Sequence, residues 1–214
     1  MADIFHEVEE DLRRDQAAAI WKKYGNYIVG AALLLVLAVA AHWGWTKYST
    51  NQQMQASADF QSAASTRDLK AREAALDKIA AEGGTYGVLA RFRLAETAIE
   101  GSDKAKARGI LGEIAKDGGA DKALRDLALI QAALLELEIG KPETAADLVK
   151  DLTKENEPYR LSALEVTGLA AMATGDTAKA KTTFETLKKT AETEAAGGAG
   201  FVQRADQMLD RLGN

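Results

Sequence analysis

The stretch from Tyr27 to Trp45 constrains this chain most, because its 19 positions contain no charged side chain. The nearest charged residues are Lys23 before it and Lys47 after it. At 1.5 Å per residue, an α-helix of this length spans roughly 28 Å, close to the hydrocarbon thickness of a bilayer. The sequence therefore predicts a membrane-spanning helix over residues 27–45, in preference to a buried helix of a soluble core.

Aromatic and basic residues at the ends of this stretch indicate how it sits in a membrane. The rings at the two edges are those of Trp21, Tyr24, Tyr27, Trp43, Trp45 and Tyr48. Amphipathic rings prefer the headgroup region, and basic residues stay on the cytoplasmic side. Four Lys and Arg residues precede the stretch, whereas residues 46–65 contain only Lys47. We expect a cytoplasmic N-terminus and an external C-terminal domain.

Two predictions concern the N-terminal part of the chain. The segment Ala38-Val39-Ala40 has the small-x-small pattern of a signal-peptide cleavage site, but the long, mixed-charge region before the helix favours an uncleaved anchor. Residues 1–26 are predicted to be a cytoplasmic amphipathic segment. Its apolar stripe consists of Ile4, Phe5, Val8 and Leu12.

Composition favours an all-α domain after the predicted membrane helix. The 214 residues include no Cys and two Pro, and the formal net charge is −5. Absence of Cys excludes disulfides and thiolate chemistry, and the acidic balance without a polybasic run argues against nucleic acid as a partner. Few Pro residues favour helices over sheets.

Small residues recur at a fixed period after residue 84. Ala95, Ala133 and Gly168 are separated by 38 and 35 residues, and each is followed 12 residues later by another small residue. A large apolar residue comes four positions after that. The residues that we predict to pack the repeats are Ala95, Ala107, Ala133, Ala145, Gly168, Ala180 and Phe184, together with Leu111 and Val149.

A period of 34–38 residues with two helices and a tight turn is typical of a helical-hairpin repeat, whose units bury their faces by stacking. Small residues let paired helices approach, and the large residue is expected to fill the gap between neighbouring hairpins. The predicted hairpins span residues 85–117, 120–156 and 158–194. Residues 46–84 are a leading irregular helix pair, and residues 85–214 are the repeats with a capping helix near 199–212.

These residues resemble the tetratricopeptide repeat. Gly175-Asp176, Ala180 and Phe184 match its Gly-Asp-x-x-x-Ala-x-x-x-large pattern, while the first repeat departs by one extra residue between Gly101 and Ala107. The short charged N-terminus, the WKKYGNYIVG entry, the single membrane helix and the degenerate repeats also resemble the ancillary subunit family of the SecYEG translocon. That resemblance implies an inner-membrane protein with periplasmic repeats, and as partners the Sec channel and a membrane-anchored periplasmic chaperone of the peptidyl-prolyl isomerase type.

Repeat solenoids bind partners on the concave surface formed by the first helix of each hairpin. The apolar positions flanking the small residues are Phe92, Ile99, Ile130, Leu134, Leu137, Leu169 and Met172, with Glu96 and Glu165 completing the set. We expect these residues either to form a partner groove or to be covered by the chain itself, because a monomer seldom exposes so large an apolar patch.

The sequence contains no catalytic or metal-binding pattern with convergent polar residues. The pair His6-Glu7 lacks the second His of a zinc-protease motif, and phosphate-binding Gly motifs are absent. We expect no cofactor, no metal, no small-molecule substrate and no enzymatic activity. The prediction is a membrane-anchored interaction protein at the Sec translocon; the alternatives are an envelope-assembly or cell-division scaffold and an enzyme with an unrecognised site.

Overall fold

The computed structural model describes residues 2–193 and 198–213, and the side chains of 2–17, 19, 20, 28 and 32 lie outside that description. All regular structure in the described residues is helical: nine α-helices and one 3₁₀-helix. The chain divides into two compact units, Met1–Gln55 and Ala56–Asn214. The predicted all-α fold is therefore confirmed.

The first unit consists of helix α1, which extends over Ala2–Ala64 and so continues into the second unit. One part of it, Trp21–Ala64, is long and apolar enough to cross a membrane by length and composition, with a mean hydropathy of 2.0 in its best window. No helix end separates residues 2–26 from the apolar stretch. The predicted stripe of Ile4, Phe5, Val8 and Leu12 falls outside the described side chains.

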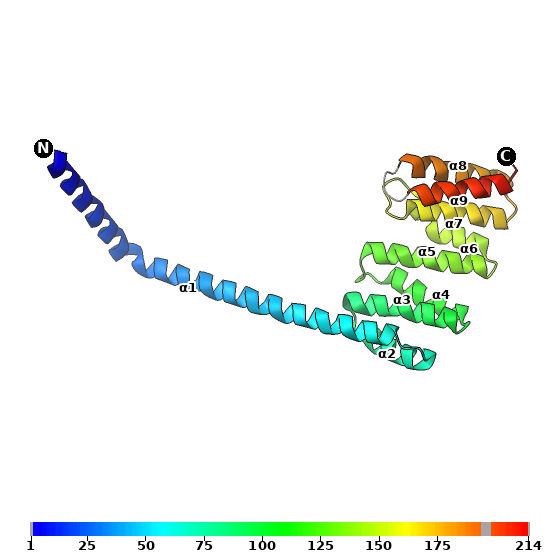
Figure 1. Cartoon of the computed structure of the whole chain (residues 1–214), viewed down its shortest axis with the longest axis horizontal. Helices are drawn as coiled ribbons and strands as arrows, with labels where there is room; N and C mark the ends of the chain where they lie inside the picture. Colours follow the sequence, from blue (N-terminus) through cyan, green and yellow to red (C-terminus); the bar gives the residue numbers. More distant parts are fainter. Residues whose placement is uncertain (1, 194–197, 214) are drawn as a thin grey trace. The chain divides into compact units, whose positions relative to one another are not determined.

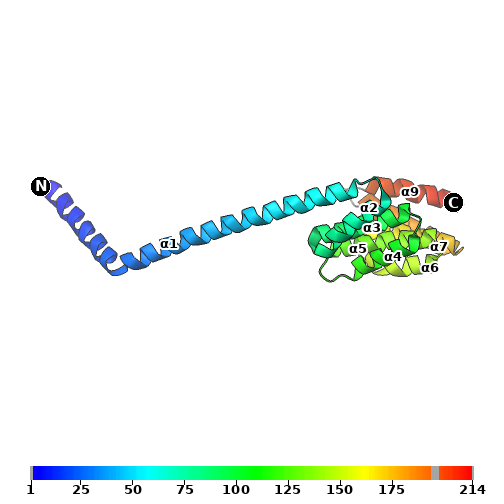
Figure 2. The ribbon, with the colours of Figure 1, turned by 90° about the horizontal axis from the view of Figure 1, so that it is seen from below.

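The second unit is a stack of antiparallel helix pairs (Figure 1). After the end of α1 come α2 (Leu69–Glu82), α3 (Gly84–Glu100), α4 (Lys104–Lys116), α5 (Lys122–Glu138), α6 (Pro142–Val149), η1 (Lys150–Thr153), α7 (Arg160–Ala173), α8 (Thr177–Thr193) and α9 (Gly198–Arg211). The predicted hairpins correspond to α3–α4, α5–α6–η1 and α7–α8. In the view turned by 90°, the helices of the second unit overlap because they are stacked in layers (Figure 2).

The three hairpin turns are built alike. In each, the backbone N–H three residues beyond the last helical residue donates to a carbonyl five residues earlier: Asp103 to Ala98 at 2.8 Å, Lys141 to Glu136 at 2.8 Å, and Asp176 to Ala171 at 2.9 Å. This pattern is the Schellman motif, which needs a residue with positive φ at its centre.

The positive-φ residue explains why the first repeat departs from the family pattern. Gly140 and Gly175 have φ values of 76° and 80°, but in the first hairpin Ser102, with φ 64°, takes this role instead of Gly101. Ser102 precedes Ala107 by five residues, as Gly140 precedes Ala145. Ala95 also precedes Ser102 by seven residues, as Ala133 precedes Gly140. The first hairpin therefore has no extra residue: Gly101 lies one position before the positive-φ position, and the three hairpins share one turn geometry.

The middle hairpin closes with a 3₁₀-helix because its connection is shorter. From Leu111 to Ala133 there are 22 residues, but from the equivalent Val149 to Gly168 there are only 19. Helix α6 ends at Val149, and η1 continues the chain. A 3₁₀-helix rises about 2.0 Å per residue against about 1.5 Å in an α-helix, so fewer residues cover the same distance.

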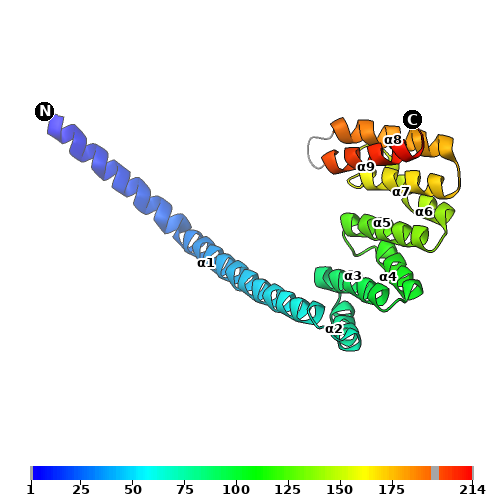
Figure 3. The same cartoon turned by 45° about the vertical axis from the view of Figure 1, so that its right-hand side comes forward.

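Clusters of buried apolar side chains occur from one end of the second unit to the other. At the leading end, Ala63 of α1 packs with the fully buried Leu76 of α2, and the rings of Phe60 and Tyr86 lie 6.0 Å apart. At the other end, α9 turns back beside α7 and α8 (Figures 1 and 3). Its Ala205 and Leu209 join the core of the third hairpin. The last helix thus covers apolar surface that a terminal hairpin would otherwise expose.

Candidate functional site

The structure buries all seven residues that we assigned to repeat packing, which are Ala95, Ala107, Ala133, Ala145, Gly168, Ala180 and Phe184. Their roles differ in one respect from the prediction. A Cβ atom at Gly168 would lie 2.7 Å from Phe184 Cζ, so the Phe184 ring rests on the Gly168 backbone of its own hairpin. The ring also belongs to the cluster that contains Ala205 of α9, so it fills space within its own hairpin and beneath the capping helix, not between neighbouring hairpins.

Two of the predicted groove residues are core residues. Phe92 packs with Leu111 of α4 and Leu135 of α5, and Ile130 packs with Ala145 of α6 and Ala163 of α7. Each side chain is only 6% exposed. Stacked hairpins bring the next layer against this position, which removes Phe92 and Ile130 from any surface that a partner contacts.

The third hairpin is partly covered by the C-terminal helix. The guanidinium of Arg204 on α9 binds the Glu165 carboxylate of α7 with two hydrogen bonds, of 2.5 and 3.0 Å. The same guanidinium lies over the Phe201 ring, 4.4 Å from its centroid. Leu169 and Met172 are half-buried against the cluster to which α9 contributes. We expected the apolar positions either to form a partner groove or to be covered by the chain itself. In this hairpin, the chain itself covers them in part.

Exposed apolar surface remains on α3 and α5. Ile99 is 41% exposed and Leu134 is 43% exposed, while Leu137 is half-buried against the core of the middle hairpin. We call Ile99, Leu134 and Leu137 the open apolar surface. Glu138, at the end of α5, lies next to it in sequence and is paired with Lys104 at 3.1 Å.

Comparison with known proteins decides the family. Residues 19–211 match the family described as tetratricopeptide repeat-like domain. The chain belongs to this family. It is also similar in structure to two crystal structures of a putative kinesin light chain with nearly identical TPR-like repeats from Podosopora anserina, one of them a point variant. Both are 14% identical and cover 76% of this chain and 92% of theirs, with TM-scores of 0.49 for the point variant and 0.45 for the other. No curated protein matches the sequence.

Within this tetratricopeptide repeat-like domain, α5 departs from the other first helices by carrying two buried carboxylates. Glu136 occupies the position of Ala98 and Ala171, three residues after the small residue, and it is 1% exposed. Its Oε1 accepts a hydrogen bond from Arg108 at 3.3 Å, whereas Oε2 is buried without a partner among the described residues. Sequence analysis missed Glu136, although its place in the repeat register is a signal that could have identified it.

The second carboxylate, Asp126, stands where the other hairpins have Val88 and Leu161, both in the core. Its side chain accepts a hydrogen bond from Lys122 at 2.7 Å, and the same ammonium binds Glu157 at 2.6 Å. Hydrogen bonds from Lys122 to Asp126 and then to Glu157 raise the pKa of Lys122. The two ion pairs join the start of α5 to the segment that precedes α7.

Ion pairs also link neighbouring hairpins through α4. Its cations at positions 104 and 108 bind Glu138 and Glu136 of α5, and Lys106 binds Glu73 of α2 at 2.5 Å. The hydrogen bond with Glu73 raises the pKa of Lys106. At the end of α4, a hydrogen bond from Arg91 lowers the pKa of the Asp117 carboxyl, and the Gly119 backbone N–H reinforces this shift. These contacts join neighbouring helices of the stack.

Metal ligands do not gather within the described residues: no group of three or more His, Asp or Glu side chains lies close enough to hold an ion. The family match supports a domain that contacts other proteins, and the open apolar surface on α3 and α5 is its candidate binding site.

Proposed function

We propose that this chain is a membrane-anchored interaction protein of the bacterial inner membrane. The apolar part of α1 crosses the membrane with the N-terminus in the cytoplasm, and the tetratricopeptide repeat-like domain lies in the periplasm. There it acts as an ancillary component of the SecYEG translocon and links the channel to a membrane-anchored periplasmic chaperone. The family supports binding of protein partners, and the resemblance of the N-terminal region supports the Sec assignment.

Exposure of the apolar part of α1 carries the proposal. The side chains of Leu33, Leu34, Leu35, Val36, Leu37 and Val39 are 59–69% exposed. Water-exposed apolar surface costs about 25 cal/mol per Å², so a run of this kind requires an apolar environment. Lipid supplies that environment, and the bias of Lys and Arg toward the N-terminal side favours the proposed orientation.

The partner segment in this proposal contacts the open apolar surface of the first two hairpins. Ile99 and Leu134 are exposed, so they can supply apolar anchors while other residues hold the stack together. The half-buried Leu137 packs against the core of the middle hairpin. On the third hairpin, α9 takes the place of a partner.

Affinity purification from detergent-solubilised membranes tests the proposal. We expect the tagged full chain to co-purify with the subunits of the Sec channel and with a single-pass periplasmic chaperone. A variant with Leu134→Glu should lose the chaperone, and the control Ala178→Glu, at an exposed position of α8, should keep it. Recovery of envelope-assembly or division proteins without Sec subunits would replace this proposal with the scaffold alternative.

Topology provides a second test that does not depend on the partner. A reporter that is active only outside the cytoplasm should work when fused after residue 214, and protease added to spheroplasts should digest the repeat domain. Protection of that domain from protease would contradict both the orientation and the periplasmic location.

A further inference from the structure

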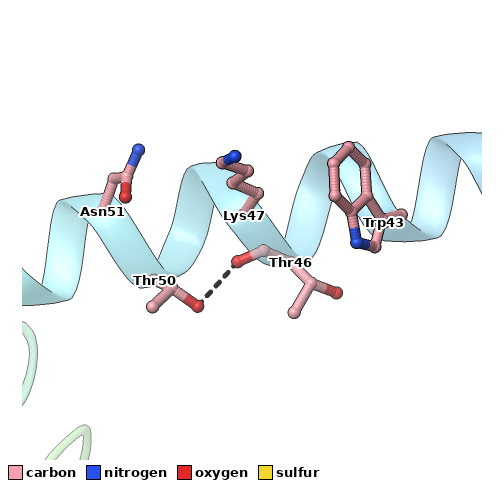
Figure 4. A pocket seen from close by; sticks show the side chains of 5 residues that line it. All are labelled: Trp43, Thr46, Lys47, Thr50 and Asn51. Atoms are coloured by element: carbon pink, nitrogen blue, oxygen red, sulfur yellow. Dashed lines mark hydrogen bonds between the residues drawn. The ribbon is translucent and has the colours of Figure 1, made fainter.

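A depression of about 320 Å³ lies on α1 at the C-terminal end of its apolar stretch. It is lined by Trp43, Thr46, Lys47, Thr50 and Asn51. Residues three and four apart are neighbours on a helix surface, so these five form two adjacent rows. Figure 4 shows Trp43, Lys47 and Asn51 rising from one side of the helix, with Thr46 and Thr50 beside them.

The two rows differ in the donors that they offer. The hydroxyl of Thr46 donates to the His42 carbonyl at 2.8 Å, and that of Thr50 donates to the Thr46 carbonyl at 2.8 Å. Their protons are therefore used within the helix. The Lys47 ammonium and the Asn51 amide form no hydrogen bond to another residue in the part of the chain that the structure describes, and so they present donors outward.

We propose that Trp43, Lys47 and Asn51 bind the phosphate group of a phospholipid in the outer leaflet of the membrane. The inference rests on the proposed function, because it requires α1 to cross the membrane. Phosphate is an acceptor-only anion, and charge-assisted hydrogen bonds from an ammonium are the strong ones. Lys47 supplies the charge, and the Asn51 amide supplies a second donor one turn further along the same row.

The depth of the site agrees with a lipid phosphate. Lys23 and Lys47 are 24 residues apart. A helix of that length spans roughly 36 Å, which exceeds the ~30 Å hydrocarbon core but not the ~40–45 Å that includes both headgroup layers. Both ammonium groups therefore reach the level of the phosphates, where long basic side chains place their charge.

The aromatic ring favours a lipid over free phosphate. Lys47 Nζ lies 5.3 Å from the centroid of the Trp43 ring, and Trp43 is 67% exposed. The indole occupies the boundary between headgroups and acyl chains, so the same site offers an apolar face to the glycerol and acyl region next to the donors. Inorganic phosphate uses only the donors and gains nothing from that face.

Native mass spectrometry tests the site with the full chain reconstituted in nanodiscs of zwitterionic phospholipid containing a minor fraction of phosphatidylglycerol. We expect the wild-type chain, released into mild detergent, to retain a phosphatidylglycerol molecule. One Lys near an anionic surface contributes about 1 kcal/mol, so Lys47→Gln combined with Asn51→Ala should lower the retained fraction roughly fivefold. Lys47→Arg should retain the lipid, and the control Lys70→Gln on α2 should behave like the wild type.

Each contrary result has its own meaning. Equal retention by the wild type and the double variant would overturn this inference while leaving the membrane anchor intact. Binding of inorganic phosphate to the lipid-free protein, at the same residues, would show a free-anion site and would also overturn it. Failure of the wild type to insert into nanodiscs would remove both this inference and the proposed function.

Discussion

The ring of Phe184 lies against the backbone of Gly168, with so little space between them that a Cβ atom at position 168 would meet Phe184 Cζ at 2.7 Å. The other hairpins pair an Ala with a residue smaller than Phe: Ala133 with Val149, and Ala95 with Leu111. The size of the residue on the second helix thus matches the room left by the first. In the third hairpin, only Gly accommodates the Phe.

Replacing Gly168 with Ala should therefore destabilise the protein by about 1–3 kcal/mol through overpacking. Gly109 provides the control, since it is exposed in the middle of α4 with no atom within 4 Å of its Cβ position. There, Gly→Ala should stabilise by about 0.5–1 kcal/mol because Ala restricts the unfolded chain and favours the helix. Chemical denaturation measures the change in the free energy of unfolding for each variant. Equal changes at the two positions would contradict the close contact between Gly168 and Phe184.

Replacing Ser102 with Gly should stabilise the protein. The φ of 64° at Ser102 lies in the left-handed region, which costs a non-Gly residue of order 1–3 kcal/mol unless the structure compensates. Ser102→Gly should recover about 1 kcal/mol of that cost, whereas Gly175→Ala, at the equivalent turn, should lose a similar amount. A destabilised Ser102→Gly variant in urea unfolding would mean that the Ser side chain has a role of its own.

Glu136 should be replaceable by an apolar residue. Glu136→Met removes a buried carboxylate with an orphan oxygen, and replacements of buried ion pairs by apolar residues are often neutral or stabilising by ~1–4 kcal/mol. Arg108→Ala leaves the charge buried and should cost about 1–3 kcal/mol. Thermal melting of the single and double variants separates the two effects. If Glu136→Met were the more damaging change, the ion pair would contribute more than its desolvation costs.

Leu134 and Ile130 should respond differently to a charge. Leu134→Glu places the carboxylate at a position that is 43% exposed, so the free energy of unfolding should change by no more than about 0.5 kcal/mol. Ile130→Glu buries a charge and should cost several kcal/mol, on the order expected for an unpaired buried group. Melting curves give the result directly. Similar losses at both positions would make Leu134 part of the core.

Acid should weaken the link between α3 and α4. Because Arg91 lowers the pKa of Asp117 in the folded protein, this carboxylate contributes stability above its unfolded pKa of about 3.8, and the contribution is lost as the pH falls through the lower, folded pKa. Asp117→Asn should therefore reduce the pH dependence of the denaturation midpoint in this acidic window.

Lys106 has the opposite pH dependence. Because Glu73 raises its pKa in the folded protein, the stability that Lys106 contributes is fully present below pH 10.5 and is lost at higher pH.

Local patterns predicted the fold well because they reflect local causes. The turn at Gly175-Asp176 and the period of small residues follow from backbone conformation and from the close approach of paired helices. The binding surface was harder to predict, since the exposure of a first-helix residue depends on what stacks against it. Phe92 and Ile130 each lie three residues before the small residue of their helix, and the neighbouring layer of the stack buries them.

The ion pair between Arg204 and Glu165 illustrates a contact that no sequence period reveals. The residues are 39 positions apart, on α9 and α7, and their pairing depends on how α9 returns along the stack. Glu136 was predictable in part. Its position in the repeat indicates that it is buried, but the sequence does not show that Arg108 of the preceding hairpin pairs with it.

Three cations in the first half of α4, Lys104, Lys106 and Arg108, give the repeats a fixed order. They reach both neighbours, Glu73 on one side and the α5 carboxylates on the other. At the equivalent positions α6 has Pro142, Thr144 and Ala146, none of which is a cation. If a copy of the middle hairpin replaced the first, Glu136 would lose the partner that Arg108 provides and would be buried without a compensating charge. Although the hairpins share one turn and one packing rule, they are not interchangeable modules. Shuffling or duplicating them would separate the partners of the ion pairs between hairpins, so these pairs form in only one order of the repeats.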